Sequence, residues 1–216
     1  MRRVDGKKLL GLVAIVGVLA VGTGLATPAF AQTIVDEWAT VKAPPAPELK
    51  PVTIDPKVTA LLMLDFVKQI CSPQARPRCV ASLPKVRGLL TQAREKGVQV
   101  IYSLAGQSVA DIWPEVAPAY GEPAVSSGPD KFLNTELEKI LKEKGIKTVI
   151  VVGTAAEGAA LNTAAGSALR GFKVIVPVDG VSSSTTYAEQ YTAWHLANAP
   201  RIGAQVTLTK IDLIRY

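Results

Sequence analysis

The chain has 216 residues, of which 48% are hydrophobic and 19% are charged, and its net charge is +6. This composition supports a single core, and the modest charge without a basic stripe interleaved with aromatic residues argues against nucleic-acid binding. One histidine and two cysteines supply too few ligands for a metal site, and we expect no cofactor.

Residues 1–31 have the three parts of a secretory signal peptide. Basic residues precede an uncharged apolar run from Leu9 to Leu25, and Ala29-Phe30-Ala31 supplies a cleavage site before Gln32. Removing this segment takes away four basic residues and one acidic residue, which lowers the net charge from +6 to +3. We therefore expect a periplasmic or secreted protein. An uncleaved signal that anchors the chain in a membrane is the alternative, since 17 apolar residues are near the lower limit for a span.

Residues 32–56 are rich in proline. Five prolines fall between Thr33 and Pro56, so we expect no helix there but an extended arm or linker that leads to one domain at residues 57–216. A homo-oligomer could use such an arm as a contact, although composition does not decide this.

The first core strand is predicted at Val58–Leu64, an apolar run that delivers Asp65 to its carboxyl end. Ligands of open α/β sheets bind at this edge, so Asp65 is a candidate catalytic residue. A structural role stays open, because the carboxylate could cap the next turn or pair with a structural lysine.

Cys71 and Cys79 are the only cysteines, and they lie in one loop that is rich in proline and arginine. In an exported chain this spacing predicts a disulfide, which would stabilise the fold by roughly 2–3 kcal/mol. A displaced nucleophile or a pair of metal ligands is the less favoured alternative. Arg76 and Arg78 could attract an anionic ligand to the site mouth, or they could be solvated loop charges.

The middle of the chain alternates between helix and strand patterns. The periodicity predicts a helix at Leu83–Lys96, a strand at Val98–Leu104, an irregular lid or pocket wall at Gly106–Gly128 and a helix at Thr135–Lys144.

The central stretch runs from Lys147 to Gly171 and predicts a buried strand, a tight turn and a helix in succession. Val149–Val152 is the β-branched strand, which Gly153 ends, and small residues recur at helical spacing from Glu157 onward. A ligand site is expected at the turn, because a helix N-terminus there offers unpaired N–H groups.

The remaining residues predict strands at Phe172–Val178 and Gln205–Ile214, with a helix between them that carries His195. A lone histidine on an aromatic helix is typical of a packed, hydrogen-bonded residue rather than of a base. Ser182, Ser183 and Ser184 lack the G-x-S-x-G elbow of a serine hydrolase.

The stretch KTVIVVGTAAEGAALNTAAGSALRG resembles the isochorismatase-like cysteine hydrolases, whose pattern is roughly G-hydrophobic-A-T-[DN]-x-C-x-x-x-T-A. The residues that fall on this pattern are Gly153, Ala155, Glu157, Thr163 and Ala164. At the position of the family's cysteine nucleophile the chain has Ala159, whose methyl group cannot attack a carbonyl. The resemblance implies a pocket at the nucleophile position that is formed by Ala155, Ala156, Glu157 and Ala159.

Two further elements resemble the same family. VTALLMLD is similar to A-L-L-V-I-D-x-Q, which implies that Asp65 is a general acid or base. SSGPDKFLNT is similar to K-x-x-x-S-x-F-x-x-T, in which Ser126 replaces the usual lysine. Lys131, five residues later, could swing into the site and pair with Asp65, or it could face solvent next to Asp130.

The resemblance covers roughly residues 58–214 and implies an α/β fold, a three-layer sandwich with a mostly parallel, six-stranded Rossmann-like sheet. The alternation of strands and helices favours the same architecture. Three functions are compatible with it: hydrolysis of a small molecule without a covalent intermediate, a non-catalytic small-molecule-binding protein of the same fold, and an amidase with a relocated nucleophile. The first requires a proton on Asp65, whose pKa burial could raise.

Overall fold

The computed structural model describes residues 33–216, so the predicted signal peptide at residues 1–31 lies outside the described part. The described residues belong to two units that divide between Ala43 and Pro44. The first contains the short helix α1 (Ile34–Glu37) and the 3₁₀ turn η1 (Trp38–Thr40). The prediction of a helix-free arm is wrong here, because Thr33 and Asp36 cap the turn through their backbone and side-chain groups.

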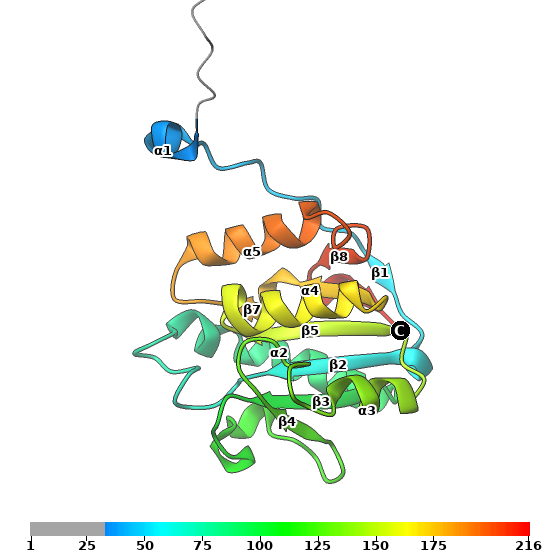
Figure 1. Cartoon of the computed structure of the whole chain (residues 1–216). Helices are drawn as coiled ribbons and strands as arrows, with labels where there is room; N and C mark the ends of the chain where they lie inside the picture. The colour runs from blue at the N-terminus through cyan, green and yellow to red at the C-terminus, as the bar shows by residue number, and fades with distance from the viewer. Residues whose placement is uncertain (1–32) are drawn as a thin grey trace, which may run out of the picture. The chain divides into compact units, whose positions relative to one another are not determined.

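The second unit is organised around a seven-stranded sheet in the order β4-β3-β2-β5-β6-β8, with β7 paired to β5, and these pairs are parallel (Figure 1). Its strands are β2 (Thr59–Leu64), β3 (Gln99–Leu104), β4 (Ala124–Ser126), β5 (Thr148–Thr154), β6 (Lys173–Pro177), β7 (Val181–Ser182) and β8 (Val206–Thr209). A second, two-stranded sheet pairs β1 (Val52–Thr53) with β9 (Ile214–Arg215). The α/β prediction is confirmed, with one strand more than the six expected.

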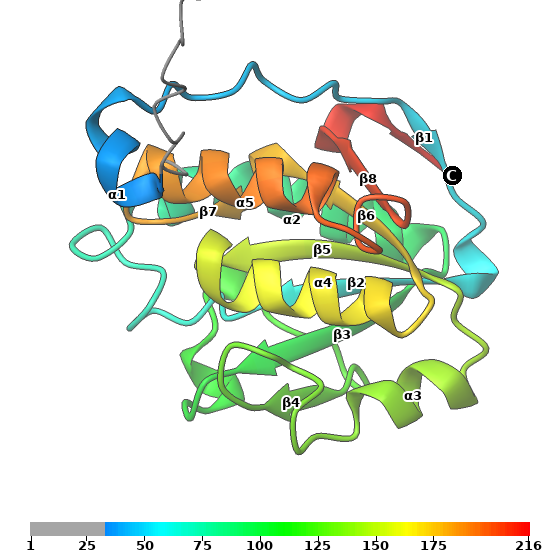
Figure 2. The same cartoon turned by 45° about the horizontal axis from the view of Figure 1, so that its top comes forward.

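Helices cover both faces of the sheet. They are α2 (Pro77–Glu95), α3 (Leu137–Glu143), α4 (Leu161–Leu169) and α5 (Thr186–Asn198). Shorter turns are η2 (Pro56–Val58), η3 (Val109–Asp111), η4 (Pro114–Val116), η5 (Ala156–Ala160), η6 (Val178–Gly180) and η7 (Ile211–Leu213). Figure 2 shows α4 and α5 in front of the sheet and α2 behind it, which gives the three layers.

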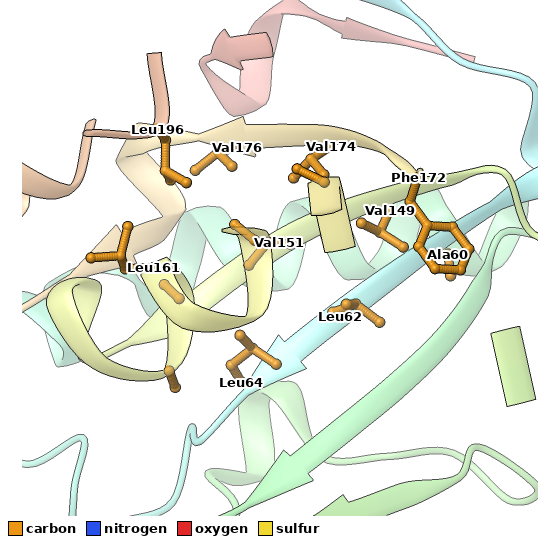
Figure 3. Packing of buried hydrophobic residues seen from close by; sticks show 14 of the residues in the cluster. Ala60, Leu62, Leu64, Val149, Val151, Leu161, Phe172, Val174, Val176 and Leu196 are labelled. Atoms are coloured by element: carbon orange, nitrogen blue, oxygen red, sulfur yellow. The ribbon is translucent and has the colours of Figure 1, made fainter. Parts of the chain in front are cut away.

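The core consists of two clusters, one on each face, because successive residues of a strand point to opposite sides. On β2, Leu62 and Leu64 join the cluster under α3, α4 and α5, which Figure 3 shows, while Leu61 and Met63 join the cluster under α2. Both sets of side chains are almost fully buried. The continuous apolar runs of β2 and β5 thus follow from a parallel sheet that is covered on both faces.

Several predicted boundaries need correction. Helix α2 begins at Pro77 rather than at Leu83, because proline fits the first turn of a helix. The segment predicted as irregular contains η3, η4 and the edge strand β4. The last predicted strand leaves the sheet after Thr209, and the chain then forms η7 and β9.

Candidate active site

Asp65 lies immediately after β2, at the carboxyl edge of the sheet. Its φ of 55° is in the left-handed region, where aspartate is one of the few tolerated side chains. The neighbouring strand is unusually close: a Cβ added to Gly153 would lie 2.2 Å from the carbonyl oxygen of Leu64. Only glycine therefore fits beside the residue that precedes Asp65.

The Asp65 carboxylate is buried, with 4% of the residue exposed, and both of its oxygens have partners. Ser103, on β3, donates its hydroxyl to Oδ1 at 2.8 Å. The ammonium group of Lys131 lies 2.8 Å from Oδ2. A buried carboxylate needs such partners, because burial without them is costly.

Lys131 has 0% of its surface exposed. Besides Asp65, its Nζ donates to the carbonyl oxygens of Leu104 at 3.2 Å and Ser127 at 3.1 Å. The three N–H donors of the ammonium group thus have three acceptors. The solvent-facing alternative is wrong, and Ser126 instead lies exposed on β4, where its hydroxyl accepts from the N–H of Gly106.

The turn after β5 carries the four residues of the predicted pocket. Ala156 and Ala159 are buried, Ala155 is half-buried and Glu157 is exposed. Gly158 has non-helical backbone angles, φ −103° and ψ −105°, so α4 begins at Leu161 and not at Glu157 as predicted. The peptide bond between Thr154 and Ala155 is cis.

The Lys131 segment packs against α4. The backbone N–H of Lys131 donates to Thr163 Oγ1 at 3.4 Å. Thr163 follows Ala159 by four residues, which is about one helical turn. Ala159 and Leu64 also belong to the same core cluster. The turn, the lysine and the strand that ends at Asp65 therefore meet at one edge of the sheet.

A series of hydrogen bonds connects Glu157 to Ser183, Glu189 and Arg78. Ser183, which is fully buried, donates its hydroxyl to Glu157 Oε2 at 2.6 Å and its backbone N–H to Glu189 Oε1 at 2.9 Å. Arg78 donates to both oxygens of Glu189, at 2.7 and 2.5 Å. These hydrogen bonds are the main reason that the pKa of Arg78 is raised. The guanidinium group of Arg78 therefore forms an ion pair with Glu189.

Cys71 and Cys79 form the disulfide that the sequence predicts, with a sulfur–sulfur distance of 2.04 Å. Cys79 lies within α2 rather than in a loop, so the bond joins the turn after β2 to the start of that helix. Trp113 Nε1 donates to the carbonyl of Cys71 at 2.6 Å. Both cysteines are buried and paired, which removes them as nucleophiles or metal ligands.

Sequence reasoning missed Ser103, and it placed Thr163 on the family pattern without predicting its contact with Lys131. Ser103 could have been found, because it lies near the carboxyl end of a strand beside β2, where polar residues gather at a ligand site. The carbonyl partners of Lys131 left no signal, since backbone groups are the same in every residue.

Residues 33–216 contain neither a candidate metal site nor a membrane-spanning helix. No group of three or more histidine, cysteine, aspartate or glutamate side chains is placed to hold a metal ion. No helix in this range has the length and apolarity to cross a bilayer.

Residues 59–210 match the model of the isochorismatase domain family. The secreted isochorismatase effector Isc1 of Verticillium dahliae is 31% identical over 113 residues, which are 47% of this chain and 60% of that protein. The chain thus spans less than two thirds of this relative's length.

Solved structures show the same fold. The chain is similar to a cysteine hydrolase from Pseudomonas syringae pv. phaseolicola, with a TM-score of 0.66, 19% identity, and coverage of 77% of this chain and 94% of that one. It is also similar to an isochorismatase family protein from Desulfovibrio vulgaris, with a TM-score of 0.65, 19% identity, and coverage of 72% and 95%. Because the residues that match the domain model are more than half of this chain, the chain belongs to the isochorismatase family.

Proposed function

We propose that the chain is an exported isochorismatase-like hydrolase that acts on a small molecule without forming a covalent enzyme intermediate. The buried pair of Asp65 and Lys131 is the observation that carries this proposal. Replacing a buried ion pair by apolar residues often stabilises a protein. A charged pair at the carboxyl edge of a parallel sheet therefore has its best explanation in chemistry.

Asp65 would act as the proton carrier. In an enol ether such as isochorismate, protonated Asp65 would give its proton to the terminal vinyl carbon, and water would add to the neighbouring carbon while its proton returns to the Asp65 carboxylate. The resulting hemiketal would then break its ether bond, with its hydroxyl proton moving to the departing oxygen, and release an alcohol and pyruvate. Lys131 and Ser103 would hold the carboxylate in place between the two proton transfers.

Ala159 supports a mechanism without a covalent intermediate. It lies at the position that the family pattern gives to the cysteine nucleophile, and its side chain offers no attacking atom. Water addition to an enol ether needs no such atom, whereas the amidase chemistry of cysteine hydrolases does. The small-molecule pocket would lie between this turn and Asp65.

Export has two independent supports. The relative in Verticillium dahliae is described as secreted, and this chain carries a disulfide, which persists in oxidising compartments. A periplasmic or secreted location also agrees with the signal-peptide pattern at residues 1–31.

The second candidate is a non-catalytic small-molecule-binding protein of the same fold. Ala159 also favours it, since a methyl group cannot act as the nucleophile of a cysteine hydrolase. One experiment separates the two. The purified chain is incubated with isochorismate and, separately, with nicotinamide, and the release of pyruvate and of ammonia is measured.

The proposal predicts pyruvate from isochorismate and no ammonia from nicotinamide. Saturable binding of isochorismate without turnover would establish the binding protein instead. Ammonia release at a rate above that of the Asp65→Asn variant would contradict both and would revive a relocated nucleophile.

A further inference from the structure

A sizeable cavity lies far from Asp65, at the opposite edge of the sheet. It has a volume of about 800 Å³ and lies where β5, β6 and β8 begin, against β1. This is the edge at the right of Figure 2, where α3 ends and β5 starts. Small-molecule sites typically measure roughly 300–1,000 Å³. The cavity therefore has the size of a ligand site.

Four basic side chains line this cavity: Lys142, Lys147, Arg170 and Lys173. Asp55 is the single acidic residue among the lining residues, so the cavity carries a formal charge of +3. The part of the chain after residue 31 also has a net charge of +3. Residues 1–31 contribute four basic residues and one acidic residue, a net of +3, to the total of +6. The residues that line the cavity thus include more basic than acidic side chains.

Two of the four cations have structural reasons to be there. Lys142 lies in the last turn of α3 and Arg170 caps the end of α4, where the partial negative charge of a helix C-terminus favours cations. Both also pair with Glu138, at 2.5 and 2.9 Å.

Neither Lys147 nor Lys173 lies at the C-terminus of a helix. Each lies at the start of a strand, and the two residues are neighbours, since the N–H of Lys173 donates to the carbonyl of Lys147 at 3.0 Å. Among residues 33–216 neither forms an ion pair with a carboxylate. Both side chains are exposed and line the cavity, so an anion bound there would meet two cations that no carboxylate of the described chain neutralises.

Part of the cavity lining is apolar, and we call this part the apolar floor. Ile54, Ile146 and Phe172 line it and are nearly buried. A ligand that fits both features has an anionic group for the lysines and an apolar part for the floor.

From this geometry we infer a second ligand site, separate from the candidate active site, for a small organic anion with a dianionic phosphate group or several carboxylates. Lys147 and Lys173 bind its charge, and the apolar floor binds its hydrocarbon part. The inference does not depend on the proposed hydrolase activity.

Isothermal titration calorimetry of the full chain at constant ionic strength tests the site, with inorganic phosphate, phenyl phosphate and citrate as probes. Phenyl phosphate or citrate should bind saturably, and phenyl phosphate should bind about tenfold more tightly than inorganic phosphate, because its ring is buried. Binding of phenyl phosphate alone identifies a phosphate ester, and binding of citrate alone identifies a polycarboxylate.

The double variant Lys147→Gln/Lys173→Gln should weaken binding at least about tenfold, because it removes two charge-assisted contacts. Lys96→Gln/Lys210→Gln removes the same charge from exposed lysines elsewhere and should leave the affinity unchanged, as should Asp65→Asn. The inference is overturned if none of the probes binds saturably, or if the control double variant loses as much affinity as the cavity variant. Equal affinity for phenyl phosphate and inorganic phosphate would rule out the role of the apolar floor.

Discussion

The buried ion pair of Asp65 and Lys131 makes a contribution to the free energy of unfolding that can be measured. Removing one partner of a buried pair leaves an uncompensated charge, which costs about 3–5 kcal/mol. Lys131→Met should lower the free energy of unfolding by about this amount in urea denaturation. The double variant Asp65→Asn/Lys131→Met should lose less than the two single variants together.

The exposed pair of Lys139 and Glu136 provides the matched control. Its side chains are 65% and 68% exposed, so Lys139→Met should leave the free energy of unfolding nearly unchanged. A Lys131→Met variant that unfolds no more easily than Lys139→Met would show that the buried pair does not exist in solution.

Whether position 159 faces the candidate active site can be tested by introducing a cysteine there. Ala159→Cys places a cysteine in the turn before α4, where backbone N–H groups should lower the pKa of the thiol. Iodoacetamide should alkylate this cysteine about tenfold faster near neutral pH than the same residue in Ala43→Cys, which is exposed. Both native cysteines are paired, so the label reports only the new thiol.

Alkylation of Ala159→Cys at or below the rate of Ala43→Cys would mean that residue 159 does not face the site. The position given to the nucleophile by the family pattern would then be wrong.

At the scale of elements, the approach of β5 to β2 positions the site. Gly153 has a φ of 140°, and a methyl group there would collide with Leu64. Gly153→Ala should therefore lower the free energy of unfolding by about 3 kcal/mol or more, since strain and overpacking act together. The measurement is chemical denaturation followed by circular dichroism.

Gly88→Ala is the control for this substitution. Gly88 lies inside α2 with open space where a Cβ would be, so alanine should be neutral or stabilise the protein by roughly 0.5–1 kcal/mol. Equal stabilities of the two variants would contradict the close strand packing beside Asp65.

The elements also show which features a sequence can predict. The apolar runs of β2 and β5 and the acid at the end of β2 were predictable, because burial on both faces of a parallel sheet leaves a direct pattern. The start of α4 was not, since the non-helical angles at Gly158 interrupt a pattern that otherwise has helical spacing. Lys131 stayed ambiguous because two of its three partners are backbone carbonyls, which only the folded chain brings together.

At the scale of the whole molecule, two buried phenols should limit stability at alkaline pH. Burial raises the pKa of Tyr216 to about 12, and burial is also the main cause of the raised pKa of Tyr102. A raised pKa in the folded state contributes stability that is fully present below the unfolded value, about 10, and is lost as the pH rises through the folded value.

The melting temperature should therefore fall as the pH rises above about 10, with phenolate absorbance increasing in the same range. Tyr102 donates its hydroxyl to the carbonyl of Val116 at 2.9 Å, so Tyr102→Phe should lower stability at neutral pH but weaken its dependence on alkaline pH. The same alkaline slope in Tyr102→Phe and Tyr216→Phe as in the native chain would exclude these phenols as its cause.

The chemistry at Asp65 is tested most directly by running the reaction with isochorismate in D₂O and analysing the pyruvate by mass spectrometry. If Asp65 delivers a solvent-derived proton to the vinyl carbon, the methyl group of the pyruvate will carry one deuterium. Asp65→Asn should release pyruvate at least about a hundredfold more slowly, which is typical for loss of a general acid. Pyruvate released without deuterium, or at the same rate by the native chain and Asp65→Asn, would contradict the account.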